Sequence, residues 1–358
     1  MVRLEDEDGF CDRLIVNDPA FKVLVLKTAR IVHRCPSFDY FLNAVRLNRS
    51  VETVIVGEQV VQMTSQENLN ELLATLGHLQ TLKTLEISLP YILEQKKLSG
   101  ASLAHFLQHA SQLEILVIWP FLLFANQEEL EETAQALQGH RSLKTMALMH
   151  ILLRHENSST GATGDGDATA QRHQTFLRMD SLLDSLTTMP HLETLQLAAG
   201  CRVNPPPGVD HPISLDILAN LLSTSASLKN LSLRNFGLTD DHCQRLIDCM
   251  VNDSSKLEYL DVRFNSITMK GFRAFFDMLR CHNYVIKYLE TSLEEISDLY
   301  DEIQFYLLLN RAGRFTFFKS ETATKADCVD VLGRTEDNID AIYYFLRRNP
   351  SLCENLSN

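Results

Sequence analysis

Residues 228–291 read LKNLSLRNFGLTDDHCQRLIDCMVNDSSKLEYLDVRFNSITMKGFRAFFDMLRCHNYVIKYLET, and this stretch decides the fold. Its first apolar triplet returns twice, 29 positions later each time: Leu228, Leu231, Leu233; Leu257, Leu260, Val262; Ile286, Leu289, Thr291. Each triplet alternates apolar and polar residues, which indicates a strand, and each is followed by a turn and a helical run. A strand, turn and helix that recur at a fixed period are typical of a solenoid.

The same triplet can be followed back towards the amino terminus. Six earlier copies are Phe21/Leu24/Leu26, Val51/Val54/Val56, Leu82/Leu85/Ile87, Leu113/Leu116/Ile118, Leu143/Met146/Leu148 and Leu192/Leu195/Leu197. The first residues of the nine triplets are 30, 31, 31, 30, 49, 36, 29 and 29 positions apart. The longer intervals indicate insertions in the fifth and sixth units. Between triplets, apolar residues three and four apart, such as Leu69, Leu72, Leu73 and Leu76, predict one helix per unit.

This pattern resembles the leucine-rich repeat family, in particular the long-repeat, ribonuclease-inhibitor-like type. Asn265, Ile267 and Gly271 match the family's corner positions. The equivalents of Asn265 elsewhere are Ala29, Gln59, Pro90, Phe121, Ile151, Gly200 and Phe236, which implies less regular corners. The resemblance implies an α/β fold: a right-handed leucine-rich repeat solenoid, or horseshoe, with a concave parallel sheet, convex helices and a helical C-terminal cap.

We expect three regions along the chain. Residues 1–20 would form an amino-terminal cap, residues 21–291 a solenoid of about nine units, and residues 292–358 a carboxy-terminal cap. A segment near 156–171, rich in Gly, Ser, Thr and Ala, has little to bury and predicts a flexible insertion. Within the carboxy-terminal region we expect a helix over 293–309, a strand at RFTFF (314–318), and helices from 325 and over 337–348.

Composition limits the classes of function. The 358 residues carry a formal net charge of −13, which disfavours a general affinity for nucleic acid or anionic membrane. No apolar run is long enough to span a bilayer, and the acidic amino terminus does not resemble a secretory signal. The eight cysteines form no CxxC or zinc-type spacing, so we expect reduced thiols. We therefore predict a monomeric cytoplasmic or nuclear protein with no cofactor and no metal.

The residues between the core positions of each strand should point onto the concave face, because side chains alternate along a strand. The candidate protein-binding residues there are Ile115, Val117, Trp119, Met149, Arg234, Tyr259, Asp261, Arg263, Tyr288 and Glu290. We expect this face to be apolar in its first half and polar in its second. Trp119, the only tryptophan, could anchor a partner or be covered by its own corner. The charged residues could contact a partner or simply pair with one another.

Motifs for catalysis are missing from the sequence. There is no GxGxxG, GxxxxGK[ST], GxSxG or HExxH pattern, so we predict no catalytic residues. His105 and His109 are four residues apart on a predicted helix, which is more typical of a solvated face than of a metal site. Arg311 and Arg314 lie in a basic segment of the cap, and we expect them to contact helix carboxy-terminal carbonyls rather than a phosphate.

Three functions are consistent with these features. The first is a non-enzymatic scaffold that binds a protein partner on the concave face. The second is a GTPase-activating or other regulatory protein of the Ran GTPase activator type, although the usual acidic tail is missing. The third is a receptor or ubiquitin-ligase substrate adaptor, which would need a further domain beyond the repeats.

Overall fold

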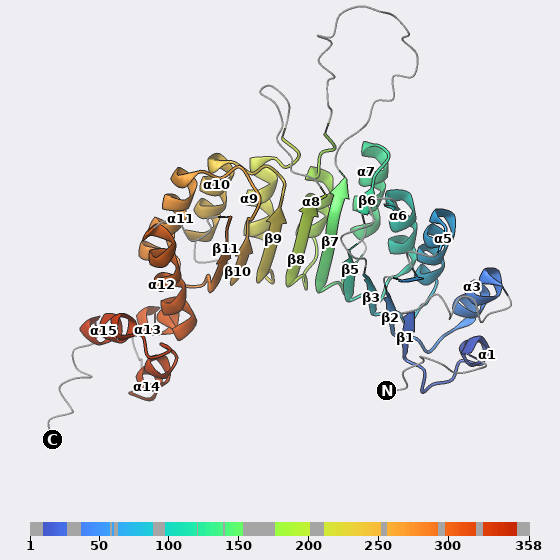
Figure 1. The fold of residues 1–358 in the computed structure, drawn as a ribbon, viewed down its shortest axis with the longest axis horizontal. Helices are drawn as coiled ribbons and strands as arrows, with labels where there is room; N and C mark the ends of the chain where they lie inside the picture. The colour runs from blue at the N-terminus through green and yellow to red at the C-terminus, as the bar shows by residue number, and fades with distance from the viewer. Residues whose placement is uncertain are drawn as a thin grey trace, which may run out of the picture.

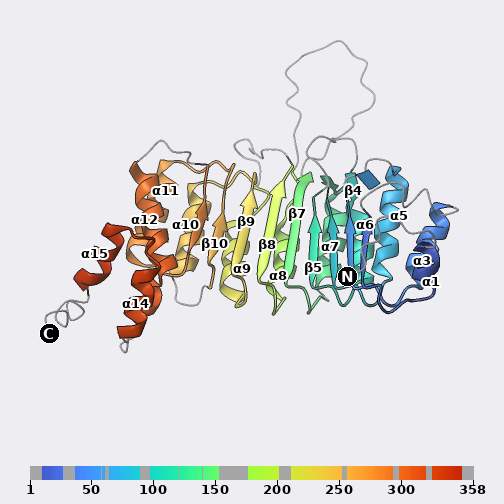
Figure 2. The same cartoon turned by 60° about the horizontal axis from the view of Figure 1, so that its bottom comes forward.

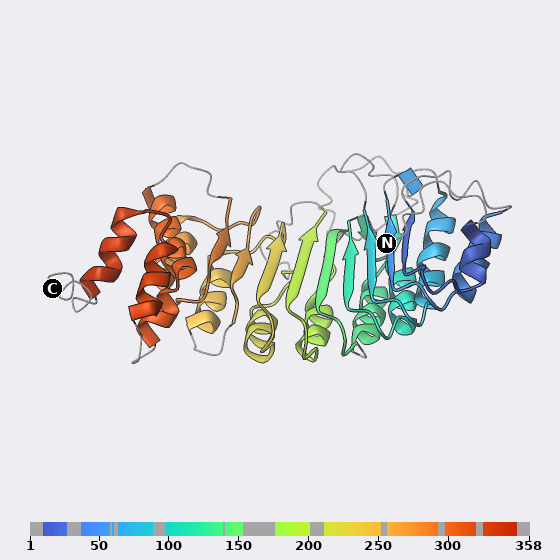
Figure 3. The same ribbon diagram turned by 90° about the horizontal axis from the view of Figure 1, so that it is seen from below.

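The computed structural model describes residues 10–26, 37–57, 59–60, 64–88, 97–119, 121–138, 140–152, 176–200, 211–251, 256–292, 298–319 and 325–348. The insertion predicted near 156–171 lies outside these residues. The described part is an arch whose inner side is a sheet and whose outer side is a row of helices (Figure 1). Turning the arch shows the strands side by side in chain order (Figures 2 and 3).

The main path of the sheet runs through nine parallel strands, one for each apolar triplet. In order they are β1 (Val23–Leu26), β2 (Thr53–Val56), β3 (Thr84–Ile87), β5 (Ile115–Ile118), β7 (Thr145–Leu152), β8 (Thr194–Ala199), β9 (Asn230–Arg234), β10 (Tyr259–Asp261) and β11 (Tyr288–Glu290). Equivalent triplet positions lie side by side, as Val54 does between Leu24 and Leu85. The arrangement confirms the predicted leucine-rich repeat solenoid.

Helices return the chain from the end of each strand to the start of the next. They are α3 (Phe38–Leu47), α5 (Gln66–Gly77), α6 (Gly100–His109), α7 (Gln127–Leu137), α8 (Asp180–Thr187), α9 (Leu215–Thr224), α10 (Asp240–Val251) and α11 (Met269–Cys281); one further helix, α1 (Phe10–Ile15), precedes β1. Several begin at a side chain that accepts a hydrogen bond from an otherwise unpaired backbone N–H. Ser37, Ser65, Asn126 and Ser214 each do so. Successive helices pack against one another along the outer side.

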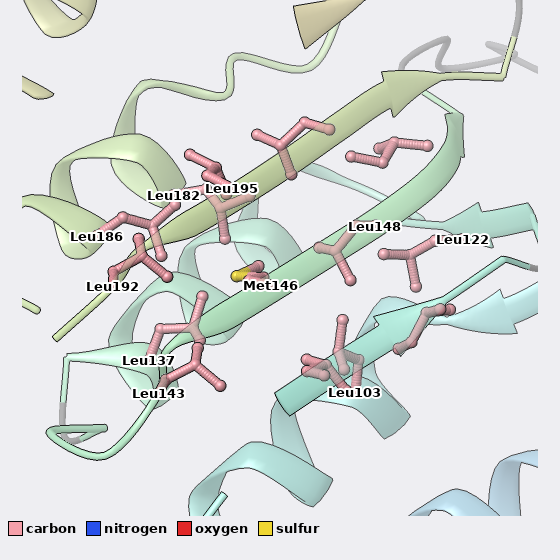
Figure 4. Close-up of a cluster of buried hydrophobic side chains, with 14 of the residues drawn as sticks. Leu103, Leu122, Leu137, Leu143, Met146, Leu148, Leu182, Leu186, Leu192 and Leu195 are labelled. Atoms are coloured by element: carbon pink, nitrogen blue, oxygen red, sulfur yellow. The ribbon is translucent and has the colours of Figure 1, made fainter. Parts of the chain in front are cut away.

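The core is one continuous layer between the sheet and the helices. Apolar side chains from helices and strands of neighbouring units meet in this layer, as Figure 4 shows for Leu137, Met146, Leu182 and Leu195. All four are 0% exposed. No unit could bury its apolar stripe alone, so each unit depends on its neighbours for stability.

Corners after the strands use a left-handed backbone at equivalent positions. His150, Asn235 and Phe264 have φ angles of 60°, 63° and 61°. One residue further on, the buried Asn265 binds the chain as it leaves the strand. Its Nδ2 donates to the carbonyls of Leu233 at 2.7 Å and Val262 at 2.8 Å, and its Oδ1 accepts from Leu238 N at 3.1 Å. The predicted asparagine corner is therefore present in this unit.

Two short strands extend the sheet beyond the corners of the middle units. β4 (Lys97–Ser99) pairs with β6 (Phe121–Leu123), and β6 pairs with the end of β7. Side chains of α5 pair with the backbone of β4: Gln66 binds both the N–H and the carbonyl of Lys97, and Asn70 accepts from Ser99 N. These amides satisfy backbone groups that would otherwise form an open edge.

The carboxy-terminal cap consists of helices α12 (Asp298–Ala312), α13 (Arg314–Lys319), α14 (Lys325–Gly333) and α15 (Ile339–Arg348). The prediction of a strand at RFTFF is wrong, because these residues belong to α13. Phe317 packs into a small apolar cluster with Leu309, Val331 and Phe345, so burial inside the cap outweighs the strand preference of aromatic residues.

Arg314 joins this cap to the last repeat. It is 1% exposed, and its guanidinium donates to the carbonyls of Leu279 at 2.7 Å and Arg280 at 2.6 Å, near the end of α11. The same group lies 4.4 Å from the ring centroid of Tyr284 and 5.1 Å from that of Tyr306. The predicted contact of Arg314 with helix carboxy-terminal carbonyls is confirmed.

Candidate functional site

The inner face of the arch consists of the side chains that alternate with the core residues of β1 to β11. Along β2, β3 and β5 the burial alternates strictly, with every second side chain partly exposed. Near the amino-terminal end these exposed side chains are mostly uncharged, including Val23, Ile55 and Thr84. Towards the carboxy-terminal end they include arginine, tyrosine and acidic side chains. The first half is therefore not uniformly apolar as predicted, since β3 presents the partly exposed Thr84 and Glu86, whereas the second half is polar as predicted.

Three side chains of the β5 unit form the apolar patch of the inner face: Ile115, Val117 and Trp119. All three are partly exposed. Trp119 directly follows β5, where its backbone N donates to Ile87 O at 2.9 Å. The patch therefore places a large aromatic side chain and two β-branched side chains where another molecule can contact them.

Met149 does not belong to this exposed patch, and the expectation that it does is wrong. Its side chain is only 4% exposed, and Ala147 on the same strand is 3% exposed. The pairing between β7 and β8 shifts register between Leu148 and Ile151, and His150 has a left-handed backbone. Residues 146–149 of β7 are all buried, so burial does not alternate along this strand as the prediction assumed.

The charged half is organised around Asp261, whose side chain is 0% exposed. Arg263 donates to it from Nε, Nη2 and its own backbone N, at 3.1, 3.0 and 3.1 Å. Arg234 donates to it from Nε at 2.5 Å. Arg263 also pairs with a second carboxylate: its Nη1 lies 3.6 Å from Oε2 of Glu290. Asp261 therefore holds the two arginine side chains in place and is not accessible to a partner.

The pKa of Asp261 lies below its ordinary value of 3.8. Burial alone would raise it, but the hydrogen bonds from Arg263 and the charge and hydrogen bond of Arg234 outweigh burial. Burial and then the nearby charge of Asp261 raise the pKa of the Tyr259 hydroxyl above its ordinary value. At neutral pH Asp261 is therefore ionised and Tyr259 is neutral.

Two tyrosines continue the inner face to its end. The ring centroids of Tyr259 and Tyr288 are 6.4 Å apart, and the guanidinium of Arg311 lies 5.5 Å from the Tyr288 ring centroid. Tyr288 is 49% exposed. Aromatic side chains held in this way provide accessible contact area and lose little conformational entropy when a partner binds.

A charge ladder follows one rim of the face, at the position just before each strand. Its members are Lys22, Glu52, Lys83, Glu114, Lys144, Glu193, Lys229, Glu258 and Lys287. Neighbours pair across the units: Glu52 with Lys22 at 2.7 Å and with Lys83 at 2.8 Å, and Lys287 with Glu258 at 2.8 Å. These bonds lower the pKa of Glu52 to about 2.

Sequence reasoning missed this ladder, although the signal was available. Reading the residue after the first position of each triplet gives strictly alternating Lys and Glu. The lysine amines of the ladder pair within the protein, as Lys144 does with Glu114 at 2.6 Å and Lys229 with Glu193 at 3.0 Å. The charges of the rim are therefore largely paired within the protein, and we expect the rim to contribute little binding energy.

Two adjacent side chains of α10, His242 and Cys243, are buried in the core. Burial raises the pKa of the Cys243 thiol to about 12, so it is not a nucleophile near neutral pH. Burial, and then the charge of His211, lower the pKa of His242 to about 4. The His242 ring bonds to the backbone at both nitrogens, to Thr239 N at 3.3 Å and Ile213 O at 3.2 Å.

On the outer side, His105 and His109 of α6 lie close to His78, which follows α5. The ring centroids of His105 and His109 are 4.5 Å apart, and those of His78 and His109 are 4.7 Å apart. Over the described ranges, no three His, Cys, Asp or Glu side chains are placed to hold a metal ion. None of the helices in those ranges is both long and apolar enough to cross a bilayer.

No protein-family model and no curated protein sequence matches this chain. Among solved structures, one chain of a yeast Rad7 and Elc1 complex is similar over 84% of this chain and 63% of its own length, with 15% identity and a TM-score of 0.47. This chain thus spans less than two thirds of that one. The leucine-rich repeat-containing protein LegL7 from Legionella pneumophila is similar over 84% of this chain and 96% of its own, with 12% identity and a TM-score of 0.37.

Proposed function

We propose that this leucine-rich repeat solenoid is a non-enzymatic scaffold that holds a protein partner against its inner face. The observation that supports the proposal is the partly exposed apolar patch of Ile115, Val117 and Trp119 on the inner face of the sheet. Tryptophan is enriched among the residues that dominate protein–protein interfaces. The polar side chains beyond the patch, around Asp261, would set the orientation of the partner.

The shape of the molecule favours a macromolecular partner. The inner face extends without interruption over nine neighbouring strands, which lie about 4.8 Å apart. A small substrate would instead need a concave pocket with a few converging polar groups. Cys243 and His242, adjacent in the chain, are both buried in packing roles. These features support a binding function over a catalytic one.

Affinity purification with the full-length chain tests the proposal. We expect Trp119→Ala to weaken at least one specific partner by about 2 kcal/mol, which is roughly thirtyfold in Kd. The matched control is Tyr343→Ala, because Tyr343 is an exposed aromatic residue (61%) on the cap helix α15. Binding curves of each purified partner with the wild type, Trp119→Ala and Tyr343→Ala give the ratio of each variant's Kd to that of the wild type.

If every specific partner binds Trp119→Ala as tightly as the wild type, the inner face is not the binding site. Met149→Ala, although suggested by the sequence pattern, is unsuitable for this test. Its side chain is buried, and the substitution would change stability and binding together.

We also propose that the protein acts as a monomer in the cytoplasm or nucleus and binds neither nucleic acid nor membranes. The net charge of −13 supports this part of the proposal, because phosphate-rich surfaces repel an acidic chain. Light scattering of the purified protein, and its migration with and without duplex DNA, test these points. A dimer at micromolar concentration or a shift with DNA would contradict them.

A further inference from the structure

Arg234 differs from the other charged side chains of the inner face in how it is bonded. Its Nε donates to the buried Asp261, whereas its two Nη groups have no acceptor among the described residues. By contrast, Arg263 uses Nε, Nη1 and Nη2 for Asp261 and Glu290. The side chain of Arg234 is 25% exposed, so its outer donors can be reached from the solvent.

The bond to Asp261 also holds the guanidinium of Arg234 in place. A guanidinium is a planar fork whose Nη groups match the two oxygens of a carboxylate. Anchoring Nε on a buried group restricts the side chain before any ligand arrives. The Arg234 side chain is therefore already ordered in the unbound protein, so binding a ligand costs less conformational entropy.

Charges around Arg234 are not balanced evenly. Asp261 is shared between two arginines, and Glu290, the other carboxylate of the cluster, lies beside Arg263. In-register neighbours of β9 on β8 are uncharged: Ala198 lies beside Arg234, and Gln196 beside Ser232. The cluster is therefore positive at its Arg234 side and negative at its Glu290 side, which attracts an anion to Arg234.

We propose that Arg234 binds an aspartate or glutamate side chain of the protein partner, next to a segment that covers the apolar patch. This inference rests on the proposed scaffold function and specifies the chemistry of its partner. Trp119 and Arg234 occupy equivalent positions of their units, three strands apart along the path β5, β7, β8 and β9. Three steps of about 4.8 Å span roughly 14 Å, which an extended segment covers in about four residues.

The partner should therefore carry an acidic residue about four positions from an apolar or aromatic anchor when it binds in an extended form. A helical segment, which rises about 1.5 Å per residue, would need about nine positions. A polyanion such as nucleic acid is disfavoured, since the chain as a whole carries a charge of −13. A single carboxylate in an otherwise neutral segment fits the local charge better.

A peptide selection tests this inference without knowledge of the natural partner. The probe is a phage-displayed library of random sixteen-residue peptides, selected on the immobilised full-length wild-type chain and, separately, on Arg234→Gln. Arg273→Gln is the matched control, because Arg273 is exposed on the outer helix α11. We expect Asp and Glu to be enriched on the wild type and on Arg273→Gln, but not on Arg234→Gln.

Individual wild-type-selected peptides should bind Arg234→Gln about tenfold or more weakly, as expected for loss of a charged hydrogen-bonded pair. Arg234→Lys keeps the charge but lacks the planar fork, so it should restore only part of this loss. The inference fails if the two selections show the same acidic content. It also fails if a phosphoserine replacing the acidic residue binds tenfold more tightly, which would assign the site to phosphate.

Trp119→Ala separates failure of this inference from failure of the proposed function. Peptides that lose affinity for Trp119→Ala but not for Arg234→Gln contradict only the carboxylate assignment. If the selected peptides bind both variants as tightly as the wild type, the inner face is not their binding site. A library that yields no wild-type binder also contradicts both proposals.

Discussion

At the scale of single residues, Asp261 shows how an inward-pointing carboxylate becomes part of a binding face. Asp261 lies on the inner face of the sheet. It is nevertheless completely buried, because Arg234, Arg263 and Tyr259 cover it. Burying a charge is costly unless charged partners and hydrogen bonds compensate for it. The two arginines provide both, and Asp261 in turn fixes their orientation.

Replacing Asp261 by Asn should lower the free energy of unfolding by about 2 kcal/mol near neutral pH. The amide retains the shape of the side chain but loses its charge, and its NH₂ group faces guanidinium donors. Urea unfolding of the two proteins measures the difference. Asp277→Asn, an exposed position on α11, is the control and should leave stability nearly unchanged.

The stability difference should also depend on pH in a defined direction. The folded-state pKa of Asp261 is depressed below 3.8, so its ionised form contributes stability above the unfolded-state pKa of about 4. That contribution is lost as the pH falls through the folded-state value. The gap between wild type and Asp261→Asn should be constant above about pH 5 and narrow below about pH 4. A gap that persists unchanged at pH 2.5 would contradict this.

At the scale of elements, the cap helices depend on one buried arginine. Arg314 begins α13, binds two carbonyls near the end of α11 and is surrounded by the rings of Tyr284, Tyr306 and Tyr344. Asn310, on the preceding helix, donates to Ile286 O at 2.7 Å and so connects α12 to the segment just before β11. The cap thus docks through polar contacts with backbone as well as through apolar packing.

Arg314→Met should destabilise docking of the cap by about 2–4 kcal/mol, because two buried carbonyls lose their donors. Hydrogen exchange should quicken in α12, α13 and α15 more than in the central strands β5 to β8. Arg334→Met serves as the control, because the Arg334 side chain is exposed and, among the described residues, pairs only with the exposed Asp330. Equal acceleration in cap and centre would show that Arg314 does not act locally.

The success of prediction differed between elements for physical reasons. The repeating strands and helices were predictable because their apolar spacing reflects burial that recurs in each unit, as at Leu195 and Leu231. The helix α13 was not, since RFTFF favours a strand locally and only packing with Phe345 and Val331 decides otherwise. The burial of Met149 was not predictable either, because residues 146–149 of β7 are all buried and nothing in the residue pattern indicates this.

The candidate site was predictable in outline but not in its bonding. Alternation placed Trp119, Arg234 and Tyr288 on the inner face correctly. It could not show that Asp261 is buried or that Arg263 takes most of its hydrogen bonds. Those facts depend on side-chain directions across three strands, which spacing alone does not determine.

At the scale of the whole molecule, the chain is a linear array in which each unit contacts its neighbours. Stability in such an array depends on where it is disturbed. Leu24 on β1 and Leu195 on β8 are both 0% exposed, but one lies in the first unit and the other in the middle.

Replacement of either leucine by alanine should cost about 2–5 kcal/mol locally. Leu24→Ala should loosen α1, β1 and α3 while the later units remain protected from hydrogen exchange. Leu195→Ala should weaken units on both sides and lower the cooperativity of unfolding. Hydrogen exchange resolved along the sequence measures both patterns, and identical profiles for the two variants would contradict a nearest-neighbour array.

The alternation of Lys and Glu along the rim, finally, is kept only when repeat units are added or removed in even numbers. Lys22 and Lys287 stand at the two ends of an odd-numbered series, so a second copy stacked end to end would bring lysine against lysine. Losing one internal unit would create the same mismatch, whereas losing two adjacent units would leave the checkerboard of charge intact. Gene rearrangements that change the length of this arch should therefore be best tolerated when they remove or add units in twos.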